Sequence, residues 1–196
     1  MEPSKQKKEG RWKLLLIVAV CAAPVIASYF TYYVIKPTAR TNYGDLLDPR
    51  NYPIPQLGAT TLDGQPAALD AYKGKWIMLQ VNDASCLDAC KGKLLDMRQV
   101  RLMQGKEMDR IERVWRITDD QPLDTQVMRE YDGTHMLRVK RAALAAWLPV
   151  EAGGALADYI YIVDPLGNLM MAYAPDARAK GLLEDMKRLL KLSHIG

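Results

Sequence analysis

The chain has 196 residues, of which 26% are charged, and its formal net charge at pH 7 is +4. This length suits one domain with an attachment. The small charge excess gives no indication of a nucleic-acid partner, and we expect none. Much of the excess is local, because residues 1–13 form a basic tail with these cations: Lys5, Lys7, Lys8, Arg11 and Lys13.

An apolar stretch without any charged residue, Leu14 to Ile35, follows the tail. As a helix rising about 1.5 Å per residue, it is long enough to cross ~30 Å of hydrocarbon. Pro24 lies within it, which membrane helices tolerate. A cleaved signal peptide is the alternative, but the run is longer than the usual apolar core of such a peptide. The sequence therefore predicts one transmembrane helix, and aromatic residues typical of a membrane interface gather at its far end: Tyr29, Tyr32 and Tyr33.

The basic tail precedes the span, so we expect the N-terminus in the cytoplasm and the remaining chain outside the membrane. The predicted location is a bacterial inner membrane, crossed once, with the C-terminal domain in the periplasm. Such a compartment permits disulfides. Residues 36–55 predict an extended linker because they hold four prolines, and the folded domain is expected over residues 56–196. The four are Pro37, Pro49, Pro53 and Pro55.

Two cysteines in the domain follow a predicted buried strand, Trp76 to Val81, and a polar loop. Cys86 and Cys90 precede or open a predicted helix, Leu87 to Met103. Their spacing places both sulfurs on one side of the chain, about one helical turn apart. The N–H groups and partial positive charge of a helix N-terminus stabilise thiolate, which attacks disulfides and binds Cu(I). The alternatives are cysteines that only pack, or one structural disulfide.

The remaining pattern predicts alternating strands and helices. Its order gives an α/β fold, a thioredoxin-like sandwich whose central mixed sheet is flanked by helices, with a β-hairpin in front. The hairpin is expected near Thr60 to Leu69, and Gly133 to His135 is expected to be a loop. The other predicted elements are a strand at Ile111 to Thr118, a helix at Thr125 to Tyr131 capped by Asp124, a helix at Leu137 to Leu148, strands at Tyr159 to Val163 and Leu169 to Tyr173, and a final helix from Pro175-Asp176.

Four stretches of this domain match a family pattern. Cys86 to Lys91 keeps the spacing and the aspartate of Cys-Pro-Asp-x-Cys-Pro but lacks both prolines, and Asp119-Asp120 is followed by Asp124-Thr125. The turn Asp164 to Asn168 and the segment Tyr173 to Asp176 also match. In these stretches the chain resembles the Sco/SenC family, which comprises membrane-anchored, thioredoxin-like proteins of cytochrome c oxidase assembly.

The resemblance implies oxidase subunits or other oxidase assembly factors as partners, and three alternative functions. The first is thiol–disulfide exchange, with Cys86 exposed as the attacking residue, Cys90 as the resolving residue, and Asp88 most simply a helix cap. The second is a Cu(I) chaperone for the oxidase copper centre, with both cysteines as ligands. The third is a non-catalytic assembly scaffold.

The family's third copper ligand is a histidine whose place falls near Leu156, where this sequence has none. His135, in a different predicted loop, is the weaker candidate ligand, and His194 lies in the C-terminal tail. Copper is therefore the only cofactor considered, and stable Cu(II) binding is not expected. The missing histidine favours thiol–disulfide exchange over copper binding as the function. No proline lies between Glu151 and Asp158, which favours a protein with a narrow range of partners over a general oxidoreductase.

Overall fold

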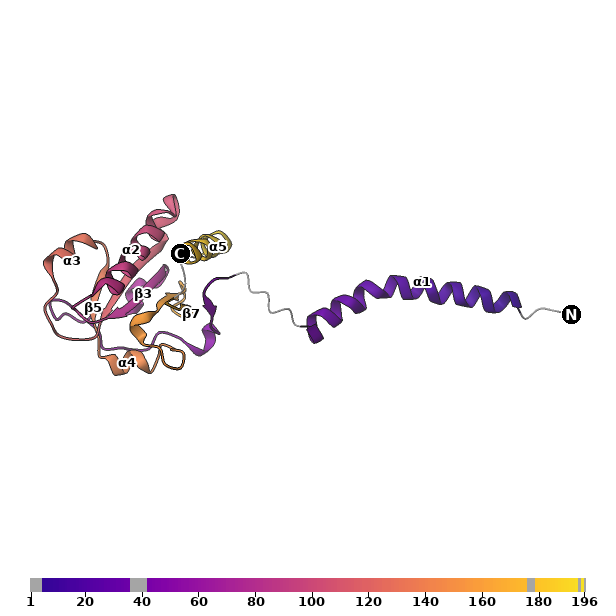
Figure 1. Ribbon diagram of the computed structural model, residues 1–196, viewed down its shortest axis with the longest axis horizontal. Helices are drawn as coiled ribbons and strands as arrows, with labels where there is room; N and C mark the ends of the chain where they lie inside the picture. The colour runs from indigo at the N-terminus through magenta and orange to yellow at the C-terminus, as the bar shows by residue number, and fades with distance from the viewer. Residues whose placement is uncertain (1–4, 36–41, 176–178, 194, 196) are drawn as a thin grey trace. The chain divides into compact units, whose positions relative to one another are not determined.

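The computed structural model describes residues 5–35, 42–175, 179–193 and 195. The chain divides into two compact units, Met1–Thr41 and Asn42–Gly196, which are described separately. Figure 1 shows α1 (Lys5–Phe30) in the first unit and the strands and remaining helices in the second.

Helix α1 continues into a π-helical turn, Thr31–Ile35, so that helical structure persists through the predicted span. The part that is long and apolar enough to cross a membrane is Arg11–Val34. Its large apolar side chains are exposed within the unit, as expected for a helix that faces lipid. Among the described residues this is one candidate membrane span, which agrees with the span predicted over Leu14 to Ile35.

The second unit is built on one mixed sheet of seven strands in the order β1-β7-β6-β3-β4-β5-β2. The central strands β3, β4 and β5 run parallel, while β6 pairs antiparallel with β3 and with β7. This confirms the thioredoxin-like α/β fold. The bounds are β1 (Asp45–Leu46), β2 (Thr60–Thr61), β3 (Trp76–Asn82), β4 (Ile111–Ile117), β5 (His135–Arg138), β6 (Ile160–Val163) and β7 (Leu169–Tyr173).

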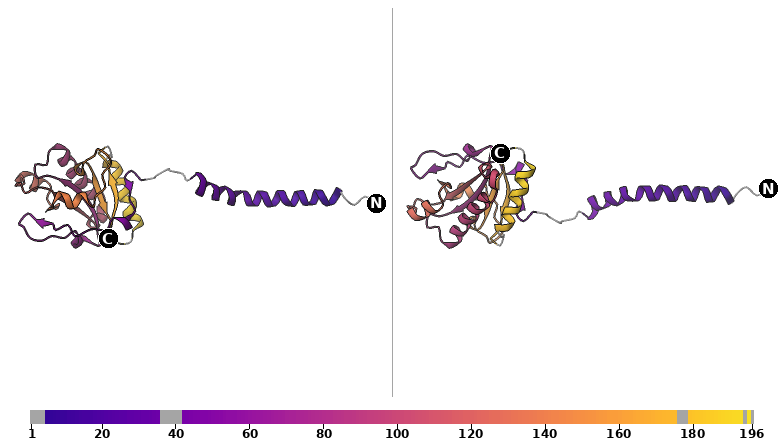
Figure 2. Two further views of the ribbon diagram at one scale, coloured as in Figure 1. Left: turned by 90° about the horizontal axis from the view of Figure 1, so that it is seen from below. Right: turned by 90° about the horizontal axis from the view of Figure 1, so that it is seen from above.

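The two faces of the sheet carry separate apolar cores. Side chains alternate along β3, so Met78 faces one core and Leu79 the other. The first core is covered by α2 (Asp88–Leu102), α3 (Thr125–Glu130) and α5 (Ala179–Leu192), and the second by α4 (Arg141–Ala145). Figure 1 shows α2 and α4 on opposite sides of β3, and Figure 2 shows α5 running along the sheet in both views.

The segment after Gly133 differs from its prediction. His135 to Arg138 is strand β5 rather than a loop and the start of a helix, and α4 covers only Arg141–Ala145 of the predicted helix Leu137 to Leu148. Leu137 pairs with Arg116 of β4 and its side chain enters the second core, while Met136 packs against the first. Leu137, whose apolar spacing suggested the start of a helix, therefore belongs to a strand, and the short helix α4 begins after it.

The predicted front hairpin is present but small. Thr61 N–H donates to the Gln65 carbonyl at 2.8 Å and Ala67 N–H to the Ala59 carbonyl at 2.9 Å. The turn between them needs Gly64, whose φ is +79°. The expected second strand at Ala67 to Leu69 does not form, because the chain turns into a 3₁₀ helix, Leu69–Tyr72.

The folded unit begins earlier than the predicted start at Gln56. Strand β1 pairs with β7, so Asp45 and Leu46 belong to the sheet. The first part of the predicted linker, residues 36–41, lies outside the described residues, as does the predicted start of the final helix at Asp176. The described part of that helix, α5, starts at Ala179.

Candidate functional site

The cysteine pair lies at the junction of β3 and α2. Cys86 ends the loop that follows β3, and Cys90 lies in the first turn of α2. The two are joined by a disulfide, with their Cα atoms 5.0 Å apart. The structure therefore brings together the two residues that the sequence singled out.

The disulfide is buried. Cys86 is 0% exposed and Cys90 is 1% exposed, both within the first core, so the predicted exposure of Cys86 is wrong. Cys86 has a φ of +37° and is the only non-glycine residue with a positive φ in the described part of the chain. This backbone conformation accompanies the inward position of Cys86, and the following residue, Leu87, is 74% exposed instead.

Hydrogen bonds hold the loop that joins β3 to α2 and ends at Cys86. Asp119 Oδ1 accepts from Ala84 N–H at 3.0 Å, Asn82 Oδ1 accepts from Asp83 N–H at 3.0 Å, and Ser85 Oγ donates to Asp83 Oδ1 at 2.5 Å. Asp119 reaches this loop because β3 and β4 are parallel and end at the same edge of the sheet. Sequence reasoning noted Asp119 only as part of a stretch that matches the family pattern, without a role at the cysteine pair.

Asp88 does not cap α2. The N-cap residue is Leu87, which makes no side-chain hydrogen bond there, and Asp88 is the first helical residue. Its carboxylate suits the positive end of the helix dipole. The same charge opposes the formation of a thiolate nearby. The expected capping role of Asp88 is therefore wrong, and its effect on the site is electrostatic.

Gln80 is a site residue that sequence reasoning missed. It lies on β3, is 0% exposed, and its Nε2 donates to Cys90 Sγ at 3.4 Å. Its Oε1 is buried without a hydrogen-bond partner among the described residues. The signal was present in the sequence, since a glutamine interrupts an otherwise apolar strand, Trp76 to Val81.

His135 lies on the other face of the sheet from the cysteines. It shares the face of Leu137, which belongs to the second core, and its ring packs 4.3 Å from that of Tyr72. Its Nε2 lies 3.0 Å from Glu112 Oε2, and Lys75 Nζ lies 2.5 Å from Glu112 Oε1. Burial raises the pKa of Glu112, but hydrogen bonds from Lys75 and His135 outweigh it, and the net pKa is lowered. The structure does not bring His135 to the sulfur atoms.

The place of the family's third copper ligand is filled by an apolar residue. Leu156 opens a short 3₁₀ helix, Leu156–Asp158, and packs into the second core. The described residues contain no group of three histidine, cysteine, aspartate or glutamate side chains that could hold a metal ion, and His194 lies outside them. The soft donors at the junction are the two sulfurs, which as thiolates suit Cu(I).

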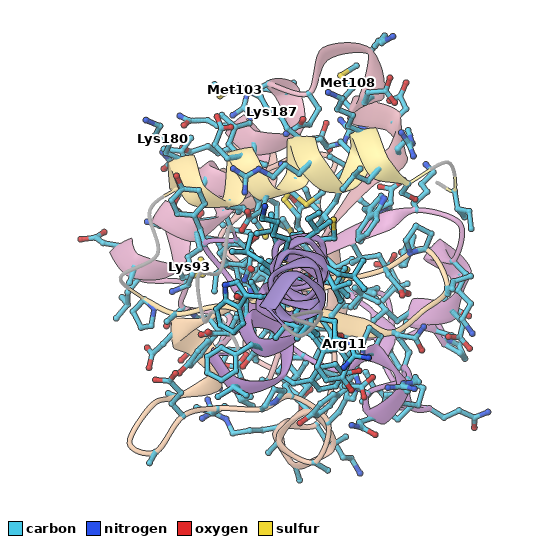
Figure 3. The ribbon with its side chains drawn as sticks, turned by 90° about the vertical axis from the view of Figure 1, so that its right-hand side faces the viewer. Arg11, Lys93, Met103, Met108, Lys180 and Lys187 are labelled. Carbon is cyan, nitrogen blue, oxygen red and sulfur yellow. A yellow bond between two sulfur atoms is a disulfide. The ribbon has the colours of Figure 1, made fainter. Side chains whose placement is uncertain are left out.

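A cavity of about 310 Å³ lies between the first turns of α2 and the start of α5, and neither cysteine lines it. Its lining includes Lys93, Asp96 and Asp158 (Lys93 is labelled in Figure 3). Burial lowers the pKa of Lys93 and raises the pKa of Asp96. The cavity beside α2 is thus lined by both apolar and charged side chains.

Two family models match most of the chain. Residues 76–193 match "Transmembrane-like, thioredoxin-like, C-terminal domain", and residues 3–34 match "Transmembrane-like, N-terminal domain". A protein of Stutzerimonas stutzeri named "Putative copper-binding protein" is 27% identical over 183 residues, which cover 87% of this chain and 85% of that protein.

The solved structures that match include Sco/SenC family proteins. BsSco, described as a member of the Sco family of cytochrome c oxidase assembly proteins with a disulfide switch, matches with a TM-score of 0.54 at 15% identity, over 74% of this chain and 98% of that one. Yeast Sco1 with copper bound matches with a TM-score of 0.52 at 18% identity, over 71% of this chain and 95% of that one. These likenesses show a shared fold.

Proposed function

Because the chain belongs to the transmembrane-like, thioredoxin-like family, we propose that it is a membrane-anchored protein of cytochrome c oxidase assembly that exchanges thiols and disulfides through Cys86 and Cys90. The observation that carries this proposal is the bonded sulfur pair at the β3–α2 junction. The fold shared with BsSco, itself described with a disulfide switch, supports it.

The proposed chemistry is ordinary exchange. In the reduced protein, the Cys86 thiolate attacks a partner disulfide and releases one partner sulfur as thiolate, giving a mixed disulfide. The Cys90 thiolate then attacks the Cys86 sulfur and releases the second partner thiolate. The partner gains two electrons, and the Cys86–Cys90 disulfide is the oxidised product.

Burial of both sulfurs constrains the proposed partner. Neither sulfur is reachable in the closed, oxidised form, so the loop between β3 and α2 has to open before any exchange. A partner that binds the surrounding surface and favours the open loop gains access, which supports a narrow partner rather than general oxidoreductase activity. We place that partner among oxidase subunits or other assembly factors, on the periplasmic side of the inner membrane.

The test is replacement of the cysteines in cells that need the protein for oxidase assembly. Cys86→Ser, Cys90→Ser and the double variant should each abolish assembly, and Cys90→Ser should accumulate a mixed disulfide between Cys86 and its partner. Alkylation of free thiols followed by mass spectrometry identifies that species. A double variant that supports normal assembly would replace the proposal with a non-catalytic scaffold.

A second candidate is delivery of Cu(I) as cargo, favoured by the name of the Stutzerimonas stutzeri relative and by copper-bound yeast Sco1. The reduced pair offers two thiolates, a donor set that suits Cu(I). Anaerobic Cu(I) titration of the reduced full chain in detergent tests it, with Cys86→Ser as comparison and His135→Ala as control. Copper uptake that is independent of Cys86 would exclude this candidate.

A further inference from the structure

The amide of Gln80 contacts one of the two sulfurs and not the other. Its Nε2 donates to Cys90 Sγ at 3.4 Å, and no hydrogen bond joins Gln80 to Cys86 among the described residues. Cys90 lies in the first core, Gln80 lies on the same face of β3 as the core residue Met78, and both are out of contact with solvent. A buried amide costs free energy unless it is hydrogen-bonded, and the hydrogen bond to Cys90 Sγ offsets this cost for the Gln80 N–H group.

The strength of that contact depends on the redox state. A disulfide sulfur is a weak hydrogen-bond acceptor, whereas a thiolate carries a full negative charge and accepts a charge-assisted bond that is roughly twice as strong as a neutral one. The interior offers Cys90 few other sources of stabilisation, because its neighbours in the first core are apolar. The Gln80 amide therefore favours negative charge on Cys90 over charge on Cys86.

We propose that Gln80 is a positioning residue that makes Cys90 the leaving sulfur, directs incoming thiolates to Cys86 and shifts the pair toward its reduced form. This rests on the proposed thiol–disulfide function and adds the direction of attack. In the step concerned, an incoming thiolate forms a bond to Cys86 Sγ while the Cys86–Cys90 bond breaks. The electron pair of that bond goes to Cys90 Sγ, where the Gln80 N–H groups receive the charge.

The test uses the full chain in detergent, equilibrated anaerobically at pH 7 with reduced and oxidised glutathione until the composition no longer changes. Two glutathione thiols supply the two electrons and two protons that convert the disulfide into two thiols. Gln80→Met keeps the side-chain volume but removes the donor. We expect it to increase the equilibrium constant for disulfide formation about fivefold, the size of one hydrogen bond of about 1 kcal/mol.

A second readout reports the direction of attack. Brief exposure to glutathione followed by acid quenching and peptide mass spectrometry gives the share of mixed disulfide on each cysteine. The unmodified chain should carry glutathione mainly on Cys86, and Gln80→Met should lose much of that preference. Gln80→Leu serves as a second variant. Met78→Leu, on the same face of β3 but without a hydrogen bond to sulfur, is the matched control.

A purely structural Gln80 would give a different result. Its replacement would lower the melting temperatures of the oxidised and reduced forms equally and leave both the glutathione equilibrium and the site of attack unchanged, which would overturn the proposal. The proposed function is tested separately by oxidase assembly in the cysteine variants. If the cysteine variants support normal assembly while the Gln80 variants still shift the glutathione equilibrium, the proposed function fails and the Gln80 proposal stands. If the cysteine variants abolish assembly while the Gln80 variants change neither readout, the Gln80 proposal fails and the proposed function stands.

Discussion

At the scale of single residues, the least expected group is the guanidinium of Arg116. It lies on β4, is 0% exposed, and its three side-chain nitrogens have no hydrogen-bond partner among the described residues. Burial lowers the pKa of Arg116 to about 10. The folded state therefore carries a buried charge that the unfolded chain leaves in water, which destabilises the fold.

We predict that Arg116→Met stabilises the domain by about 2 kcal/mol, because an unbranched apolar side chain replaces an uncompensated charge. The pKa is lower in the folded state than in the unfolded state, so the penalty is complete below pH 10 and lessens only as the pH rises beyond it. The gain should thus be equal at pH 6 and pH 8 in urea unfolding. The exposed Arg129→Met should change nothing, and a destabilised Arg116→Met would contradict the prediction.

Unlike the charge of Arg116, the charge of Glu112 stabilises the folded state. Its carboxylate receives hydrogen bonds from Lys75 and His135, and its pKa is lowered in the fold. A lowered carboxyl pKa contributes stability that is present above the unfolded value, near 4.5, and is lost as the pH falls through the folded value. Glu112→Gln should therefore cost about 1 kcal/mol at pH 7 and less at pH 3, which lies below the unfolded value. Urea unfolding at both pH values checks this, and an equal cost at both would contradict it.

At the scale of elements, α5 binds the N-terminal segment of the domain through Asp185. This buried carboxylate accepts from Tyr43 N–H at 2.8 Å, Gly44 N–H at 3.1 Å and Tyr173 Oη at 3.0 Å. A Cβ on Gly44 would lie 2.7 Å from the Tyr173 ring, so glycine is required for this approach. Residues 43–44 are thereby fixed against α5 and β7.

We predict that Asp185→Ala destabilises the domain by about 3 kcal/mol, since two buried donors and one partly buried donor lose their acceptor. Hydrogen exchange should show lost protection of the Tyr43 and Gly44 amides before global unfolding. The neighbouring Glu184→Ala provides the control, with little change in either quantity. Retained protection at both amides in Asp185→Ala would show that the segment is held by other contacts.

The loop between β3 and α2, which ends at Cys86, is held in part by Asp119, which accepts the Ala84 N–H. Asp119→Ala should loosen this loop and increase the rate of disulfide reduction by dithiothreitol about fivefold, as expected from the loss of one hydrogen bond of about 1 kcal/mol. The exposed neighbour Asp120→Ala should leave the rate unchanged. Equal rates for both variants would indicate that the loop is not what limits access.

The sequence was informative where apolar periodicity is unambiguous. It predicted β3, β4, β6, β7 and α2 closely, because each combines an apolar pattern with clear turn residues. It failed at β5, where four residues gain their strand character from pairing with β4. It also gave the cysteine pair but not its burial or the Gln80 contact, because these depend on the backbone conformation at Cys86 and on which face of β3 meets α2.

At the scale of the whole molecule, the described structure consists of a membrane-helix unit and a folded unit that begins at Asn42. Both cores of the folded unit are formed by residues after position 42. We predict that a chain of residues 42–196 alone folds, remains soluble after removal of membranes, and melts within a few degrees of the full chain in detergent. A chain that begins at Gln56 lacks β1 and should melt lower. Equal melting of the two shortened chains would contradict the role of the N-terminal segment.

Burial of both sulfurs also has a kinetic consequence in the cell. Bystander thiols, which collide with the protein without binding it, meet the closed loop and exchange only during rare spontaneous openings. The oxidation state of the pair is then insulated from the redox poise of its surroundings on short timescales. Under the exchange proposed above, the pair keeps the oxidation state left by its last specific partner until another partner binds and opens the loop.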